Sequence, residues 1–352
     1  MTPTIPLTSL GWSDNFHSQL TDDERASFHP ARVAEVHRDR LSTLTPDGPA
    51  TLWLPNGMST SQLAVGDWVL SDPASAHLTR CLARTTLLSR RAAGDASRDQ
   101  LIAANVDTAF LTTSCNADFN EARLERYLAL IHQGNIRPVI LLTKADTCPD
   151  PSEYLSRLAA IAPNTTAFAL NAKDPATAQR LAEWCAPGQT VCFLGSSGVG
   201  KSTLAHTLTG LRLETGSIRE DDAKGRHTTT ARALFEIPGG GWLIDTPGMR
   251  ELRLSDVADG IEATFADLVA LAQSCRFTDC AHEREPGCAI QAAITTGSLD
   301  PARLTRWQKL SREDRSNAAS AATLRARAPT RSFGKASRDV AKHKRRWDDL
   351  EE

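Results

Sequence analysis

Gly195-Ser196-Ser197-Gly198-Val199-Gly200-Lys201-Ser202 is the stretch of sequence that decides the fold of this chain. It matches the pattern G-x-x-x-x-G-K-[ST] at every position. An apolar run at 191–194 precedes it and predicts a buried strand, and a helical pattern at Thr203–Leu208 follows it. In this context, backbone N–H groups and the helix N-terminus face the phosphates of a nucleotide. We expect Lys201 to reach the β- and γ-phosphates and Ser202 to ligate Mg²⁺.

The composition bounds the classes of function. A length of 352 residues suffices for two or three domains, and 41% hydrophobic and 23% charged residues are ordinary for a soluble globular protein. The formal net charge of −2 argues against a general affinity for nucleic acid, so any basic surface must be local. No apolar run approaches the ~18 residues of a membrane span, and the N-terminus lacks the pattern of a signal peptide. We therefore expect a cytoplasmic protein with no membrane partner.

The first part of the chain predicts an arm and a small β domain. Residues 1–30 show little periodicity, which indicates a mobile or loosely docked arm. Residues 31–91 hold short β-prone pieces between turn signals such as Pro46-Asp47-Gly48 and Pro55-Asn56-Gly57. This pattern favours an antiparallel barrel, with an OB-fold as the best prediction and an SH3-like barrel as the alternative. Either a solvated linker or a basic contact for RNA or nucleotide explains the arginines Arg80, Arg84, Arg90, Arg91 and Arg98.

Residues 92–254 alternate between strand and helix signals, which predicts a P-loop α/β domain with a mostly parallel, doubly wound sheet. Strands are expected at 105–113, 138–142, 166–170, 191–194, 231–237 and 241–244. Helices are expected at 121–133, 152–161 and 176–185. The phosphate-binding loop then lies at the end of an inner strand, where ligands bind in such sheets.

Asp245-Thr246-Pro247-Gly248 ends the last of these strands and matches the D-x-x-G element of GTPases. In that element the Asp holds Mg²⁺ through water and the Gly N–H contacts the γ-phosphate, so we place Asp245 and Gly248 in the site. The polar stretch 220–230 occupies the position of switch I, where Thr229 is expected to complete the Mg²⁺ shell. A disordered loop is the alternative for that stretch.

Thr143-Lys144-Ala145-Asp146 resembles the guanine-reading N-K-x-D element. The Asp146 carboxylate can accept two hydrogen bonds from guanine, whereas adenine would leave it unpaired. Thr143 replaces the usual Asn, and since a hydroxyl is shorter and offers one donor, the contact of that residue stays open. A helix cap in an ordinary loop is the alternative. Asn171-Ala172-Lys173 stands where a GTPase has its S-A-K loop.

The order of these motifs is permuted. GTPases run P-loop, switch I, D-x-x-G, N-K-x-D and S-A-K, whereas here the last two come first. The strands keep their places in the sheet if the two termini of a GTPase with the ordinary order are joined, at the position between Lys173 and the P-loop in this chain. The permuted domain then ends just after Gly248, and the chain leads directly into a C-terminal domain. The nucleotide state can therefore act on that domain.

Met249 stands where many GTPases have a water-positioning Gln, and a thioether cannot orient water. We therefore expect slow basal hydrolysis unless another residue acts. His227 is the candidate catalytic residue beside Lys201, because a neutral imidazole can accept a proton from water. An ordinary loop histidine is the alternative.

The region 255–352 contains a metal-ligand pattern and a basic tail. Three cysteines and a histidine in fourteen positions suit one closed, structural Zn²⁺ site per chain, formed by Cys275, Cys280, His282 and Cys288. The five other cysteines are expected to be buried thiols. Residues 324–347 hold nine Lys and Arg against one acid, which suggests contact with a phosphate backbone. A solvated helix or disordered end is the alternative.

These features together resemble the ribosome small-subunit-dependent GTPase A family, RsgA, also called YjeQ. The resemblance rests on the permuted motifs, Gly66-Asp67-Trp68-Val69 in the OB-like region, Gly225-Arg226-His227-Thr228-Thr229-Thr230 and the zinc-ligand spacing. It implies a monomer that hydrolyses GTP to GDP and phosphate with Mg²⁺. It also implies binding to the small (30S) ribosomal subunit and its 16S rRNA, action late in maturation of that subunit, and stimulation by it.

Two alternatives belong to other classes. One is an RNA-binding GTPase with another task, in translation or metal-centre assembly. The other is a non-enzymatic RNA-binding scaffold whose GTP site acts only as a clamp.

Overall fold

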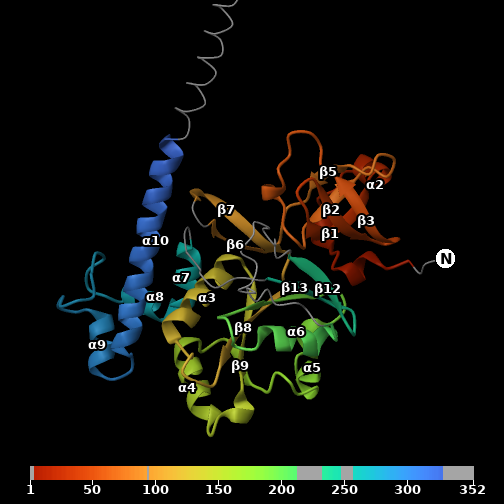
Figure 1. Cartoon of the computed structure of the whole chain (residues 1–352). Helices are drawn as coiled ribbons and strands as arrows, with labels where there is room; N and C mark the ends of the chain where they lie inside the picture. The colour runs from red at the N-terminus through yellow and green to blue at the C-terminus, as the bar shows by residue number, and fades with distance from the viewer. Residues whose placement is uncertain (1–3, 93–94, 212–231, 247–256, 328–352) are drawn as a thin grey trace, which may run out of the picture.

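The computed structural model describes residues 4–92, 95–211, 232–246 and 257–327 (Figure 1). They form an N-terminal β region, a central α/β domain and a helical C-terminal domain. In the part of the chain so described, no helix is both long enough and apolar enough to cross a membrane.

Residues 4–28 are packed against the rest of the protein, so the expectation of a mobile or loosely docked arm is wrong for them. They form η1 (Leu7–Leu10), α1 (Asp14–His17) and α2 (Asp22–Ser27). The ring of Trp12 lies 4.8 Å from that of Trp68, edge to face, and Leu10 is fully buried. The Trp242 indole donates to the Ser9 carbonyl oxygen at 2.7 Å. The apolar residues of this segment are too irregularly spaced for a periodic signal, yet they fit a surface formed by distant strands.

The N-terminal β region is a five-stranded barrel. β1 pairs antiparallel with β2 and β4, β2 pairs with β3, and β4 pairs with β5. A bridge between Trp53 and His77 brings β3 to β5, which gives the partly open barrel that an OB-fold requires. The strands are β1 (His29–Val36), β2 (Arg40–Thr45), β3 (Gly48–Trp53), β4 (Trp68–Ser71) and β5 (Leu78–Cys81).

Part of the arginine-rich stretch belongs to a two-stranded ribbon, β6 (Leu87–Ala92) with β7 (Asp95–Ala104). Arg84 pairs with the buried Asp67, with Nε 2.6 Å from Oδ1. Arg80 pairs with Glu24 at 2.9 Å. These two arginines are therefore engaged in holding the N-terminal region together.

The central domain contains the predicted doubly wound sheet. Its strand order is β10-β9-β8-β11-β13-β12, and every pair is parallel except β12 with β13. The Glu35–Ala233 pair continues this sheet into β1 of the barrel. The strands are β8 (Thr108–Ser114), β9 (Arg137–Thr143), β10 (Thr166–Ala169), β11 (Thr190–Leu194), β12 (Ala233–Ile237) and β13 (Gly241–Asp245).

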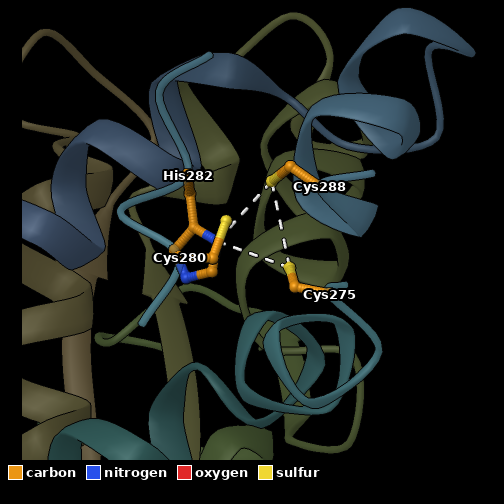
Figure 2. Close-up of side chains that lie close together, drawn as sticks. All are labelled: Cys275, Cys280, His282 and Cys288. Atoms are coloured by element: carbon orange, nitrogen blue, oxygen red, sulfur yellow. Dashed lines mark hydrogen bonds between the residues drawn. The ribbon is translucent and has the colours of Figure 1, made fainter. Parts of the chain in front are cut away.

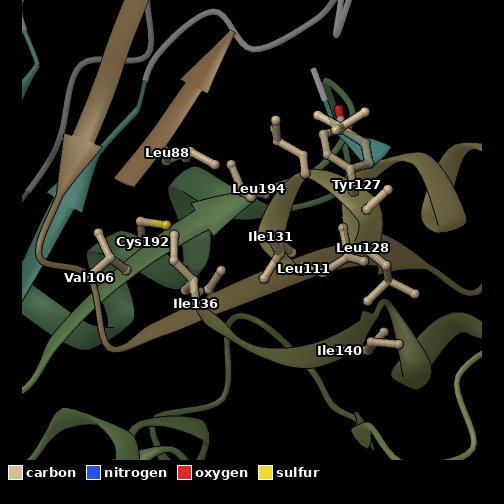
Figure 3. Close-up of a cluster of buried hydrophobic side chains, with 14 of the residues drawn as sticks. Leu88, Val106, Leu111, Tyr127, Leu128, Ile131, Ile136, Ile140, Cys192 and Leu194 are labelled. Carbon is tan, nitrogen blue, oxygen red and sulfur yellow. The ribbon is translucent and has the colours of Figure 1, made fainter. Parts of the chain in front are cut away.

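Helices cover this sheet largely as expected. Figure 3 shows Leu128 and Ile131 of α3 over Leu111, Ile140 and Leu194 of the strands. The helix predicted at 176–185 is broken, because α5 ends at Arg180 and a 3-10 turn follows. The helical elements are α3 (Glu121–Gln133), η3 (Ala145–Thr147), α4 (Pro151–Ile161), α5 (Ala176–Arg180), η4 (Ala182–Cys185) and α6 (Lys201–Thr209).

Residues 257–327, the described part of the C-terminal domain, contain four helices, of which α10 is the longest (Figure 1). The first two of these helices are separated at Phe265, whose ring is fully buried and whose φ of −112° interrupts the helix. The elements are α7 (Ala258–Thr264), α8 (Ala266–Gln273), α9 (Ala289–Thr295) and α10 (Pro301–Arg327).

Candidate functional site

The predicted phosphate-binding loop links β11 to α6. Gly195 has a φ of 137°, and a Cβ there would lie 2.1 Å from the Thr112 carbonyl oxygen, so only glycine fits. The Lys201 ammonium donates to the carbonyl oxygens of Gly195, at 2.7 Å, and Ser196. It is therefore held within the loop, where it can neutralise an anion cradled by the backbone N–H groups.

Asp245 lies at the end of β13, the strand next to β11. Burial raises the pKa of its carboxyl, while the backbone N–H of Thr246 and the charge of Lys201 act in the opposite direction. The Thr246 hydroxyl donates to the Phe193 carbonyl oxygen at 2.8 Å, which fixes the start of the D-x-x-G segment beside the loop. A desolvated carboxylate next to a cation at this edge is suited to binding a hydrated divalent ion.

The loop expected to read guanine follows β9. Thr143 is fully buried, and its hydroxyl lies 2.6 Å from the carbonyl oxygen of Val199 and 3.0 Å from that of Thr113. Thr143 is therefore engaged by the backbone, and it joins this loop to the P-loop. Lys144 has a φ of 58°, which turns the chain so that Asp146 is exposed on η3.

The three loops meet around Gly200. A Cβ at Gly200 would lie 3.6 Å from the Thr143 hydroxyl and 3.7 Å from the Ala172 side chain. The Thr207 hydroxyl of α6 also donates to the Ala172 carbonyl oxygen at 2.7 Å. The P-loop, the 143–146 loop and the 171–173 loop thus converge at the carboxyl ends of β11, β9 and β10, although they are scattered in the sequence.

Several predicted site residues lie outside the described part of the chain. They are His227 and Thr229 in 212–231, Gly248 and Met249 in 247–256, and the basic tail beyond residue 327. The roles expected of these residues stay predictions.

The three cysteines and the histidine of the C-terminal domain come together (Figure 2). The His282 Nδ1 lies 3.6 Å from the Sγ atoms of both Cys275 and Cys288, and these sulfurs are 3.9 Å apart. With Cys280 included, all ligand atoms lie within 4.8 Å of one another. A tetrahedron with Zn–S bonds of about 2.3 Å has sulfur–sulfur edges of about 3.8 Å. The donor set and its spacing therefore fit Zn²⁺.

Residues that the sequence analysis missed hold this cluster in place. The Gln291 side chain donates to the His282 carbonyl oxygen at 2.6 Å. The His282 ring stacks on Trp307 of α10, with centroids 5.8 Å apart. Such contacts orient metal ligands. Neither Gln291 nor Trp307 belongs to a motif, because their role arises only when α9 and α10 pack around the cluster.

Comparisons with known proteins agree with this arrangement. The sequence model of the family described as RsgA GTPase matches residues 81–255. A protein of Mesorhizobium japonicum named Small ribosomal subunit biogenesis GTPase RsgA is 54% identical over 88% of this chain and 90% of its own. A Vibrio parahaemolyticus protein named Small ribosomal subunit biogenesis GTPase RsgA 2 is 48% identical over 97% and 94%.

Solved structures match the fold. YjeQ from Thermotoga maritima superimposes with a TM-score of 0.61 at 21% identity, covering 80% of this chain and 97% of that one. A structure described as YloQ, a circularly permuted GTPase, gives a TM-score of 0.59 at 22% identity, covering 82% and 96%. Each likeness covers at least four fifths of this chain and nearly all of the other, so both show the same fold.

Proposed function

Because the chain belongs to the RsgA family of small ribosomal subunit biogenesis GTPases, we propose that it binds the maturing small (30S) subunit and its 16S rRNA. On this proposal the subunit stimulates hydrolysis of GTP to GDP and phosphate late in assembly. The observation that carries the proposal is the convergence of the three loops at Gly200 within a chain that also bears the Cys₃His cluster.

Each loop has a distinct task in this proposal. Lys201 and the N–H groups of 195–200 hold the β- and γ-phosphates, and Asp146 accepts hydrogen bonds from guanine. Ser202 and Asp245 hold Mg²⁺, which neutralises charge on the phosphates when it is bound. Thr143 contributes by fixing the guanine loop against the P-loop rather than by touching the base.

The Cys₃His cluster is proposed to hold one structural zinc ion. All four ligand positions are protein atoms, which leaves no place for a reacting water. The cluster therefore shapes the C-terminal domain, the part that we propose meets the ribosome. A cytoplasmic monomer is the form in which we expect this to happen.

GTP hydrolysis measured with and without purified small subunits tests the proposed function. We expect strong stimulation by small subunits, none by large subunits, and none in Lys201→Ala. Equal rates with either subunit would favour the alternative of a GTPase with another task, in translation or metal-centre assembly. If the wild type hydrolyses GTP and Lys201→Ala does not, the alternative of a non-enzymatic scaffold is excluded.

A further inference from the structure

His282 has a backbone conformation that residues with a side chain seldom adopt. Its φ is 61°, in the left-handed region. There the Cβ of an L-residue lies too close to the carbonyl oxygen that follows it, so such a conformation lasts only where surrounding contacts hold it. In this conformation the His282 Nδ1 lies 3.6 Å from the Sγ atoms of both Cys275 and Cys288 (Figure 2). The geometry of the Cys₃His cluster therefore depends on the contacts that hold this backbone.

The side chain of Glu285 binds the backbone on both sides of His282. Its Oε1 accepts a hydrogen bond from the Ala281 N–H at 2.9 Å. Its Oε2 accepts from the N–H groups of Glu283, at 2.9 Å, and Arg284, at 3.0 Å. A carboxylate suits this place because it has two oxygens that only accept. One side chain thus fixes the two residues that adjoin the histidine in the sequence.

Further hydrogen bonds tie this segment to the next ligand and to two helices. The Glu285 carbonyl oxygen accepts from the Cys288 N–H at 3.2 Å. Gln308 of α10 donates to the Ala281 carbonyl oxygen at 3.3 Å, and Gln291 of α9 donates to that of His282 at 2.6 Å. Each peptide group that adjoins residue 282 is therefore held by at least one side chain. The two glutamines bind carbonyl oxygens, whereas Glu285 binds N–H groups.

We propose that Glu285 is a positioning residue for the metal site, which keeps His282 in the ligand set by holding its backbone in the left-handed conformation. The inference rests on the proposed zinc site and names a residue outside its four ligands. Without the carboxylate, the backbone at residue 282 relaxes and the imidazole turns away from the sulfur atoms. Residues that orient metal ligands typically change metal affinity 10–100-fold when they are replaced.

Glu285→Gln tests the proposal with little change in size. The amide keeps one accepting oxygen and replaces the other with an NH₂ group, which would face N–H donors. Zn²⁺ affinity of the full chain is measured by competition with a chromophoric chelator. We expect the dissociation constant to rise about tenfold in Glu285→Gln and about thirtyfold or more in Glu285→Ala, which loses all three bonds. An unchanged dissociation constant in Glu285→Ala would overturn the proposal.

Glu283→Gln is the matched control, because it removes the same charge from the same loop. Glu283 is exposed, and it is the backbone N–H of this residue that takes part in the contacts above. An effect of the lost negative charge alone would appear in both variants. Equal effects of Glu283→Gln and Glu285→Gln would therefore reject the positioning role. GDP binding and melting temperature of every variant report whether the rest of the chain is folded.

Co²⁺ in place of Zn²⁺ reports on the ligand set itself, because its d–d absorption depends on coordination, whereas the filled d shell of Zn²⁺ gives no such bands. His282→Ala supplies the spectrum of the cluster without its histidine. We expect the spectrum of Glu285→Ala to shift toward that of His282→Ala, and that of Glu283→Gln to match the wild type. Weaker binding with a wild-type spectrum would show a merely structural role and contradict the proposal.

The wild type separates this inference from the proposed zinc site. If wild-type protein binds neither Zn²⁺ nor Co²⁺, the metal site itself fails and the role of Glu285 fails with it. If the wild type binds both ions and Glu285→Ala matches it in affinity and spectrum, the metal site stands and only the role of Glu285 is rejected.

Discussion

The hydroxyl oxygen of Thr143 lies 2.6 Å from the carbonyl oxygen of Val199, so the loop expected to read guanine is tied to the loop expected to hold phosphate. Thr143→Val keeps the shape but removes the donor from a fully buried site. Leaving a buried carbonyl unpaired costs about 1–3 kcal/mol, so we expect affinity for both GTP and GDP to fall about tenfold. Thr143→Ser retains the hydroxyl and should stay near wild type. Equal affinities of the two variants in equilibrium binding would refute this role.

Asp146 is predicted to select guanine. Asp146→Asn should weaken GTP binding by about 2 kcal/mol, because a paired contact is lost. The same variant should favour xanthosine triphosphate, whose ring carbonyl suits the amide. Competition binding with both nucleotides measures the change, with the exposed Asp118→Asn on a neighbouring loop as the control. An Asp146→Asn protein that binds GTP normally would remove Asp146 from the site.

Asp245 should oppose stability in the nucleotide-free protein. Burial raises its pKa above 3.8, so the folded state binds this proton more tightly than the unfolded state does. Its contribution is therefore unfavourable at neutral pH, and the penalty disappears as the pH falls below the unfolded pKa. Asp245→Asn is expected to raise the melting temperature at pH ~7 but not at pH ~3.5, and to weaken Mg²⁺-dependent GTP binding. If Asp245→Asn shifted the melting temperature equally at both pH values, this account would be contradicted.

Loss of zinc is predicted to affect the C-terminal domain and to leave the nucleotide site intact. Cys288→Ala should lose the metal and destabilise the C-terminal domain, because binding and local folding are coupled. It should still bind GDP, since none of the nucleotide motifs lies beyond residue 249. Metal analysis and GDP binding are the measurements, and Cys81→Ala in β5 is the matched control. If wild-type protein purified without chelator contained no zinc, the proposed metal site would be ruled out.

Catalysis is predicted to depend on a residue other than Met249, and His227 is the candidate. Free protein should turn GTP over slowly, since GTPases without full transition-state machinery run up to ~10⁵-fold below the assisted rate. His227→Ala should bind GTP and small subunits normally but lose most of the stimulated rate. Lys201→Ala should impair nucleotide binding as well, because its ammonium contacts phosphate already in the ground state. If small subunits stimulated His227→Ala fully, another group would have to position the attacking water.

Local patterns were enough to predict much of the α/β domain. The helix expected at 121–133 has those bounds in the structure, and the strand expected at 138–142 is β9. Both have strong signals, a helical apolar face in one and a continuous apolar run in the other. Weakly patterned pieces were missed, among them β2, β5 and the packing of residues 4–28. Their conformation depends on partners far away in the chain, which override local propensity.

The sequence by itself determined the chemistry of the sites. The P-loop and the Cys₃His set are short sequence patterns, of at most fourteen positions, so they can be identified without a fold. The permuted order of the motifs then follows from their residue numbers. Only the tertiary structure decided how these sites are connected. Glu125 and Arg303 are 178 positions apart, and no local rule pairs them. Buried charges and hydroxyls must find partners wherever packing brings them, and that packing placed Thr143 on Val199 and α10 on α3.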